Sequence, residues 1–293
     1  MRLRANGLLK VRNIAMDCAT QGAAEGLPLV LLHGYSDSWR SYLPLMDALP
    51  ERFRIVAMSM RGHGDSTKPS DGYDTATLAE DVVAALDALG IARAVVVGHS
   101  MGSLVAQRIA IEHPERVSRL VLIGAFATIK GNAAVEAFWR DEVSGLGDSI
   151  DPAFVSAFQQ SSVAVPMPDP FFENVVAESL KVPARVWRRM LRALLDEDRS
   201  YRLRDVAVPS LIIWGEQDAF TSRSEQHLLL NQIPDAHLAI YPGVGHAPHW
   251  EDTRRASADI AAFIDGAKRP GRLNTVGDQN LATDPHLILE KQP

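Results

Sequence analysis

Residues 94–112 read AVVVGHSMGSLVAQRIAIE, and this stretch decides the fold. The apolar run Ala94 to Val97 is typical of a buried strand, and Ser103 to Glu112 continues as a helix. Between them, Gly98 to Gly102 matches the pattern G-x-S-x-G, in which a strained turn exposes the central serine. Because glycine and serine are common, the pattern becomes specific only through the strand before it and the helix after it. Together they predict a strand–turn–helix unit that presents Ser100.

Short apolar runs alternate with helical patterns over most of the chain. This alternation predicts the α/β class, with a mostly parallel central sheet and helices on both of its faces. The other expected strands are Leu29–Leu32, Arg54–Met58, Val117–Ile123, Ser210–Trp214 and His237–Tyr241. The other expected helices are Tyr73–Leu89, Ser222–Asn231 and Thr253–Ala267.

The alternation is lost between Gly124 and Pro209, which predicts an inserted helical cap of about 75 to 80 residues. The cap is rich in aromatic residues, and Pro183 is expected to open one of its helices. We therefore expect a core of residues 1–124 and 206–267, a helical cap of residues 125–205, and a mobile tail of residues 268–293.

The composition of the 293 residues is that of a globular protein, with 46% apolar and 23% charged residues. The net charge is −6 and the basic residues are scattered, which argues against nucleic acid or a membrane as a partner. A single cysteine, Cys18, excludes an internal disulfide framework. No signal peptide or membrane-spanning run is recognised, so we expect a cytoplasmic protein with a small-molecule substrate. The oligomeric state remains open.

A serine hydroxyl becomes a good nucleophile only when a neighbouring base takes its proton. The turn motif carries a fixed chain order, in which an acid and then a histidine follow the serine on loops after later strands. Asp218 follows the strand that ends at Trp214, and His246 follows the final strand. Parallel strands end at one edge of a sheet, so we expect Ser100, Asp218 and His246 to meet there.

Two of these assignments have alternatives. His249 is the rival base, although the glycines around His246 favour the latter by letting its loop approach the nucleophile closely. Glu216 is the rival acid, but the shorter side chain of Asp218 suits the orientation of an imidazole. His99 adjoins the serine, and we expect its side chain to point elsewhere.

Two backbone N–H groups are expected to stabilise the oxyanion that forms during acyl transfer. One belongs to Met101, directly after the serine, and the other to Tyr35, in the loop after the first buried strand. His33 is expected to brace that loop by hydrogen bonds. No carboxylate and histidine spacing suggests a metal, and no cofactor is expected.

The chain resembles the serine-nucleophile branch of the α/β-hydrolase superfamily from about Leu8 to Ala267. The matching motifs are His33-Gly34, Arg61-Gly62-His63-Gly64-Asp65-Ser66, Gly98-His99-Ser100-Met101-Gly102, Trp214-Gly215-Glu216-Gln217-Asp218 and Gly245-His246. The resemblance implies a helical cap and an activity of the esterase, lactonase or haloperoxidase kind. Superfamily members that use an aspartate nucleophile, the haloalkane dehalogenases and epoxide hydrolases, are disfavoured by Ser100.

The leading hypothesis is hydrolysis of a small neutral carboxylic ester or lactone through an acyl-enzyme on Ser100. A cofactor-free haloperoxidase or perhydrolase, or a carbon–carbon bond hydrolase, could use the same triad. An alternative of another class is a small-molecule receptor or signalling protein that retains the triad. The charge-free stretch Pro152 to Pro168 favours neutral substrates. An inward-facing arginine among Arg185, Arg188, Arg189 and Arg192 would argue against that preference.

Overall fold

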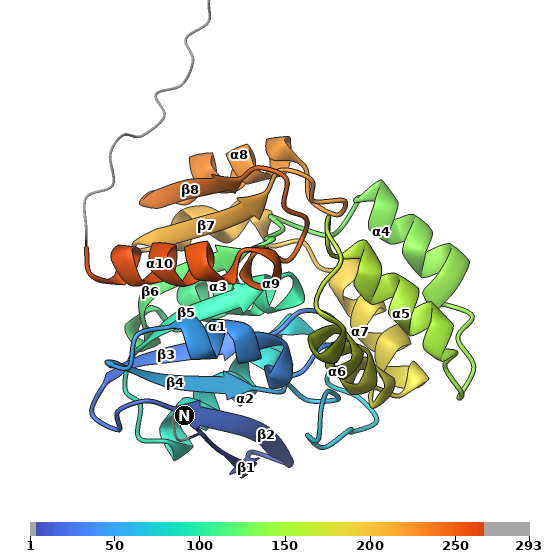
Figure 1. Ribbon diagram of the computed structural model, residues 1–293, viewed down its shortest axis with the longest axis horizontal. Coiled ribbons are helices and arrows are strands. Elements are labelled where there is room, and N and C mark those ends of the chain that lie inside the picture. Colours follow the sequence, from blue (N-terminus) through green and yellow to red (C-terminus); the bar gives the residue numbers. More distant parts are fainter. Residues whose placement is uncertain (1–3, 267–293) are drawn as a thin grey trace, which may run out of the picture.

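The computed structural model describes residues 4–266, which form one eight-stranded sheet with helices on both faces (Figure 1). The order of strands across the sheet is β1-β2-β4-β3-β5-β6-β7-β8. The strands are β1 (Arg4–Val11), β2 (Ile14–Gln21), β3 (Leu27–Leu32), β4 (Phe53–Met58), β5 (Ala94–His99), β6 (Val117–Ile123), β7 (Ser210–Gly215) and β8 (Ala236–Tyr241). The α/β class expected from the sequence is confirmed.

Strands β3 to β8 run parallel to one another, whereas β2 pairs antiparallel with both β1 and β4. The side chains of β5 alternate between two buried cores, because successive residues of a strand point to opposite faces. Val95 and Val97 belong to one core and Val96 to the other. Burial on both faces explains why the parallel strands read as continuous apolar runs in the sequence.

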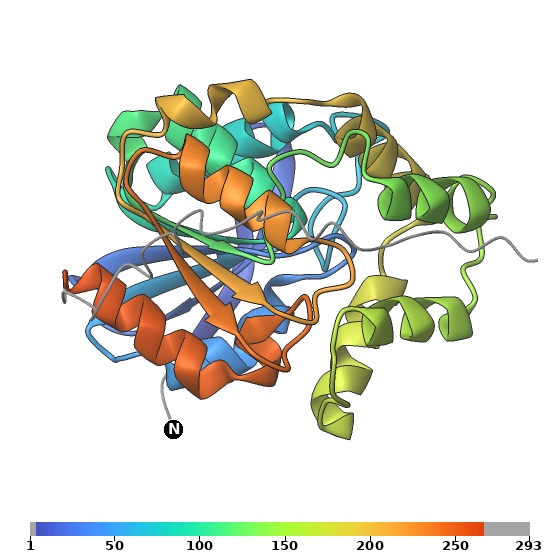
Figure 2. The same cartoon turned by 90° about the horizontal axis from the view of Figure 1, so that it is seen from above.

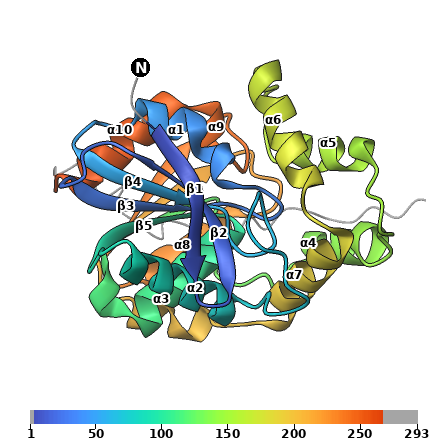
Figure 3. The same cartoon turned by 90° about the horizontal axis from the view of Figure 1, so that it is seen from below.

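Helices cover the two faces of the sheet in two groups (Figure 3). The first group consists of α1 (Leu43–Ala48), α9 (Pro248–Glu251) and α10 (Thr253–Ile264). The second group consists of α2 (Thr75–Ala88), α3 (Met101–Glu112) and α8 (Arg223–Gln232). Short 3-10 helices lie at Trp39–Tyr42, Pro114–Arg116 and Ser200–Asp205, and a π-helical turn lies at Trp139–Val143.

Residues 125–205, between β6 and β7, are here called the helical insertion. It contains α4 (Ala133–Phe138), α5 (Pro152–Ser161), α6 (Asp169–Leu180) and α7 (Ala184–Asp196). These four helices lie beyond the carboxyl ends of the parallel strands (Figures 1 and 2). The helical insertion is therefore placed over the edge of the sheet at which the loops after β3, β5, β6, β7 and β8 meet.

Aromatic rings hold the helical insertion together. The ring of Phe138 stacks on Phe158 at a centroid distance of 5.1 Å, and both Phe154 and Phe158 contact Trp187 of α7. At the base of the insertion, the Thr128 hydroxyl donates to the backbone carbonyl of Glu197 at 3.3 Å. The segment that enters the insertion therefore lies beside the segment that leaves it.

No bounds were predicted for β1 or β2. The only fully buried residue of β1 is Val11, and the polar residues Asp17 and Gln21 interrupt the apolar pattern of β2. The predicted boundaries of the other strands differ from the observed ones by at most two residues. Within residues 4–266, no helix is long and apolar enough to cross a membrane. The predicted tail, residues 268–293, lies outside the described part of the chain.

Candidate active site

Ser100 occupies the turn between β5 and α3 with a φ of 52° and a ψ of −117°. A positive φ is uncommon for a residue other than glycine, and such a conformation costs on the order of 1 to 3 kcal/mol. Ser100 lines a pocket at the carboxyl edge of the sheet. Because α3 begins at the next residue, the positive end of the helix dipole also points to this pocket.

The two glycines of the motif are required by close backbone packing. A Cβ on Gly98 would lie 2.2 Å from the carbonyl oxygen of Gly102. A Cβ on Gly102 would likewise lie 2.2 Å from the carbonyl oxygen of Leu32. Neither backbone oxygen can move aside without displacing a strand or a helix. The pattern G-x-S-x-G thus has a steric cause in this chain.

Asp218 and His246 are brought together although they are 28 residues apart in the sequence. The Nδ1 atom of His246 lies 2.8 Å from Oδ2 of Asp218, and both side chains are almost completely buried. A carboxylate can only accept hydrogen bonds, so Nδ1 carries the proton and Nε2 keeps its lone pair. His246 lines the same pocket as Ser100. Nε2 of His246 can therefore act as a base toward a proton donor in the pocket.

The surroundings of Asp218 keep it ionised. Burial by itself would raise the pKa of its carboxyl group, but the electrostatic interaction with His246 and hydrogen bonds to the carboxylate outweigh this effect. The hydrogen bonds come from His246, from the Thr221 hydroxyl at 2.6 Å and from the Phe220 N–H at 2.8 Å. The net result is a pKa below the usual value for Asp218. Sequence reasoning missed Thr221, whose position three residues after Asp218 was the only signal.

Gly34, Tyr35 and Met101 also line the pocket. Among residues 4–266, no acceptor is found for the backbone N–H of Tyr35 or of Met101. Both groups are thus free to donate to an atom in the pocket. His33 braces this loop as expected, since Nδ1–H donates to the Gly34 carbonyl at 2.7 Å and Nε2 accepts from the Met60 N–H at 2.9 Å.

The two rival residues lie elsewhere. His249 is completely buried among the rings of Tyr42, His99 and Trp250, and it does not line the pocket. Burial lowers the pKa of His249 well below its usual value. The exposed Glu216 pairs with Arg223 at 2.6 Å, on the surface of the loop. Neither residue is therefore placed to exchange a proton with Ser100.

A model of the family described as alpha/beta hydrolase fold matches residues 28–253. The chain belongs to this family. The match includes the turn at Ser100 and the loops that carry Asp218 and His246. In this α/β-hydrolase the helical insertion lies over the edge of the sheet that carries these residues.

Similar proteins differ in their reported activities. This α/β-hydrolase is 29% identical, over 83% of its length, to the dihydrolipoyllysine-residue acetyltransferase component of the acetoin cleaving system of Pseudomonas putida. The aligned part spans only 65% of that protein. An esterase structure from Exiguobacterium antarcticum has a TM-score of 0.81 at 21% identity, covering 89% of this chain and 100% of the esterase. The esterase RhEst1 from Rhodococcus sp. ECU1013 has a TM-score of 0.77 at 25% identity, covering 90% of this chain and 99% of the esterase.

The pocket of this α/β-hydrolase contains two polar residues that sequence reasoning missed. Asp37 lines the pocket and is almost completely buried, and its Oδ1 accepts a hydrogen bond from Nε2 of Gln159 at 3.0 Å. Gln159 belongs to α5, so this contact joins the loop after β3 to the helical insertion. No local pattern marks either residue, because their contact links segments 122 residues apart.

His99 does not point away from the site, as the sequence argument expected, because its ring packs against that of His246 at a centroid distance of 5.1 Å. Its Nε2–H donates to the backbone carbonyl of His246 at 3.1 Å. His99 Nδ1 therefore carries a lone pair, has no hydrogen-bond partner within residues 4–266 and lies 4.0 Å from Oδ2 of Asp37. His99 thus holds the backbone of the loop that carries His246.

Burial raises the pKa of Asp37 to about 7, although the hydrogen bond from Gln159 and the electrostatic interaction with His246 lower it in part. In the unfolded chain this carboxyl group ionises near its ordinary pKa of 3.8. At pH values between these two pKa values, the carboxyl group loses its proton in the unfolded state but retains it in the folded state. Asp37 therefore destabilises the fold increasingly as the pH rises from about 4 to about 7.

Replacing Asp37 by asparagine is expected to remove this pH-dependent destabilisation. The amide group of the new asparagine could also donate a hydrogen bond to His99 Nδ1. Asp37→Asn should therefore raise the free energy of unfolding relative to the unaltered protein, and this gain should be larger at pH 8.5 than at pH 5.5. Since one pKa unit corresponds to about 1.4 kcal/mol, the gains at the two pH values should differ by about 2 kcal/mol. Urea unfolding at the two pH values measures this difference. The exposed Asp148→Asn variant serves as the control. An equal effect at both pH values would show that Asp37 is ionised throughout.

Proposed function

We propose that this chain is a serine hydrolase of small neutral carboxylic esters or lactones. In this proposal Ser100 is the nucleophile, His246 is the general base and Asp218 orients the imidazole. The proposal rests chiefly on the 2.8 Å contact between His246 and Asp218 at the pocket that also contains the strained Ser100. The similarity to the esterase RhEst1 supports the same class of reaction.

The reaction would begin with transfer of the Ser100 hydroxyl proton to Nε2 of His246 as the oxygen attacks the ester carbonyl carbon. The carbonyl oxygen would become an oxyanion that accepts hydrogen bonds from the N–H groups of Tyr35 and Met101. Each such donor is worth about 3 to 4 kcal/mol in related sites. The ionised Asp218 would stabilise the imidazolium.

In the second half of the reaction, His246 would return its proton to the leaving alcohol, which leaves an acyl group on Ser100. A water molecule would then give a proton to His246 and attack the acyl carbon. His246 would then return this proton to the Ser100 oxygen as its bond to the acyl carbon breaks, which releases the acid and restores the free hydroxyl. In a lactone, the alcohol and the acid are parts of one molecule, so ring opening yields a single hydroxy acid.

The pocket lining supports a preference for uncharged substrates. Most of its wall is apolar, and its one carboxyl group, Asp37, would repel a carboxylate. The four arginines of α7 are turned to other partners. They bind the carbonyl groups of Lys68, Leu146 and Ser70 and the carboxylate of Asp196. None of these arginines lines the pocket.

A matched pair of esters tests this preference. The specificity constant, kcat/KM, should be at least tenfold higher for p-nitrophenyl butyrate than for p-nitrophenyl hemisuccinate at pH 8, because a buried carboxylate without a partner is strongly disfavoured. In the Asp37→Asn variant the ratio should narrow, since one source of repulsion is removed. A tenfold preference for the hemisuccinate would contradict the proposal and would indicate an arginine that turns inward on binding.

Repeated turnover of p-nitrophenyl acetate tests the hydrolase assignment itself. A hydrolase should release many equivalents of p-nitrophenol per protein molecule. A burst of one equivalent followed by near silence would instead favour a receptor that retains the triad. Peracid formation from acetate and hydrogen peroxide, in the absence of efficient ester turnover, would favour a perhydrolase.

A further inference from the structure

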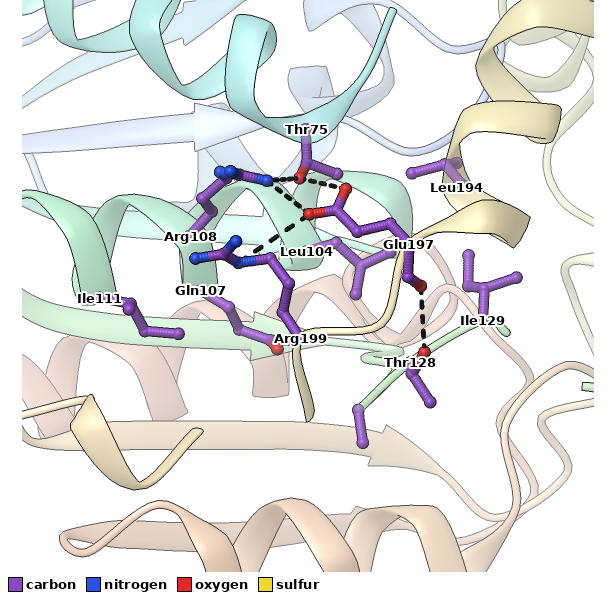
Figure 4. A pocket seen from close by; sticks show the side chains of 11 residues that line it. Thr75, Leu104, Gln107, Arg108, Ile111, Thr128, Ile129, Leu194, Glu197 and Arg199 are labelled. Atoms are coloured by element: carbon purple, nitrogen blue, oxygen red, sulfur yellow. Dashed lines mark hydrogen bonds and ion pairs between the residues drawn. The ribbon is translucent and has the colours of Figure 1, made fainter. Parts of the chain in front are cut away.

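A second cavity lies at the base of the helical insertion, between α3, the start of α2 and the two segments that lead into and out of the insertion (Figure 4). We call it the neck cavity. Its apolar wall consists of Leu104, Ile111, Ala127, Ile129 and Leu194, and its polar rim includes Thr75, Arg108, Thr128, Glu197 and Arg199. None of these rim residues lines the pocket that contains Ser100.

The neck cavity and the pocket at Ser100 share part of their walls. Ile129 and Leu194 line both spaces, and each of these side chains is almost completely buried. The partition between the two spaces therefore includes two aliphatic side chains, which can change rotamer without breaking a hydrogen bond. A flexible chain could pass from one space into the other at this point.

The charges on the rim of the neck cavity are balanced. Arg108 donates to Glu197 and, at 2.9 Å, to the hydroxyl of Thr75. Arg199 pairs with Glu112 and lies 3.9 Å from Glu197. Two cations thus face two carboxylates, so a charged ligand would have to displace an existing ion pair. The apolar wall is therefore suited to an uncharged alkyl chain.

Helix geometry indicates how long such a chain must be. Ser100 precedes α3, and Leu104 and Arg108 follow it by four and eight residues. At about 1.5 Å per residue, these positions lie roughly 6 and 12 Å further along the helix axis. An extended alkyl chain advances about 1.3 Å per carbon on standard bond geometry. A chain of about eight to ten carbons would span this distance, whereas an acetyl group would not.

We propose that the neck cavity binds the distal carbons of a long, uncharged alkyl chain whose ester group lies at Ser100. This proposal rests on the ester hydrolase function proposed above, and it extends the neutral substrates from small esters to esters with a chain of about eight to ten carbons. The chain would pass between Ile129 and Leu194 and replace water against the apolar wall. An alkyl chain in the acyl part of the substrate and one in the alcohol part have the same chemistry, and the experiments below distinguish them.

Ala127→Leu tests the proposal, because Ala127 lines the neck cavity but not the pocket at Ser100. The three added carbons would exclude two or three methylenes of the ligand, and each buried methylene is worth about fourfold in affinity. The ratio of kcat/KM for p-nitrophenyl decanoate over the acetate should therefore fall at least tenfold. The exposed Ala134→Leu variant on α4, with the same added volume, should leave this ratio unchanged.

A second variant tests the proposal independently if Ala127→Leu does not fold. Ile129→Val widens the passage by one carbon and should raise the decanoate-to-acetate ratio by twofold to fourfold. A pair of esters, ethyl decanoate and decyl acetate, distinguishes the acyl from the alcohol chain, since only the ester with the accommodated chain should lose activity in Ala127→Leu. If neither variant changes the ratio by more than twofold, the neck cavity does not bind the chain.

Binding to the inactive Ser100→Ala variant separates this proposal from the hydrolase function. Titration calorimetry with 1-decanol should give at least tenfold tighter binding to Ser100→Ala than to Ser100→Ala combined with Ala127→Leu. Tight binding without any ester turnover by the unaltered protein would sustain the neck cavity and overturn the hydrolase. If the unaltered protein hydrolyses p-nitrophenyl acetate and the two variants bind 1-decanol equally well, the hydrolase function is supported and the neck cavity is not a binding site.

Discussion

The Ser100→Ala variant is expected to lose ester turnover by a factor on the order of 10⁶ in kcat, as found when the serine of a comparable triad is removed. Alanine lacks the hydroxyl oxygen that attacks the carbonyl carbon, and no acyl-enzyme can form. The fold should be retained, because alanine meets the same steric limits at a φ of 52° as serine does. Steady-state hydrolysis of p-nitrophenyl acetate, with circular dichroism as a check of folding, measures the loss.

The neighbouring Ser103 provides a matched control. Its hydroxyl is tied to the backbone carbonyl of Ser100 at 2.6 Å, and the residue is completely buried. An organophosphonate should therefore label Ser100 and leave Ser103 unmodified, as judged by mass spectrometry of the digested protein. If Ser100→Ala kept more than a hundredth of the original activity, the nucleophile would have to be sought elsewhere.

Replacing His246 by alanine is expected to reduce kcat nearly as much as Ser100→Ala. Without the imidazole, no group takes the proton of the serine, and residues that act as a unit have strongly non-additive effects. The Ser100→Ala, His246→Ala double variant should therefore be hardly less active than either single variant. Turnover of p-nitrophenyl acetate by the three folded variants measures this relationship.

The control for this prediction is His249→Ala. His249 contacts Tyr42, His99 and Trp250, but neither of its ring nitrogens has a hydrogen-bond partner in the described part of the chain. Its removal should lower the free energy of unfolding through the cavity it leaves, while kcat per folded molecule should fall less than tenfold. Equal losses of kcat in the two histidine variants would transfer the role of base to His249.

The parallel strands and the turn at Ser100 could be predicted because their causes are local. A strand buried on both faces must be apolar throughout, as in Val95 to Val97, and the backbone contacts of Gly98 and Gly102 tolerate no side chain. The chain order of Asp218 and His246 after their strands also follows from topology. In contrast, β1 is an exposed edge strand, and such a strand leaves little apolar pattern in the sequence.

The polar groups of the pocket could not be predicted, because they depend on contacts between distant segments. Gln159 lies in a stretch without charged residues, which favoured an apolar environment, yet its amide donates to Asp37 of another loop. The sequence places His99 next to Ser100, but the hydrogen bond from His99 to the backbone carbonyl of His246 forms only because the fold brings their two segments together. Charge patterns along a sequence do not report such pairings.

The contact between Thr128 and Glu197 has a consequence for how this protein could change over evolution. This hydrogen bond closes a loop between residues 69 apart. Most of the helical insertion therefore begins and ends at the same place on the sheet domain. The entropy of closing a loop varies slowly with its length, and doubling the length adds only about 0.6 kcal/mol. Segments of other lengths could therefore be exchanged at this point at small thermodynamic cost. Selectivity could then diversify by recombination while the sheet and its reactive edge are inherited unchanged.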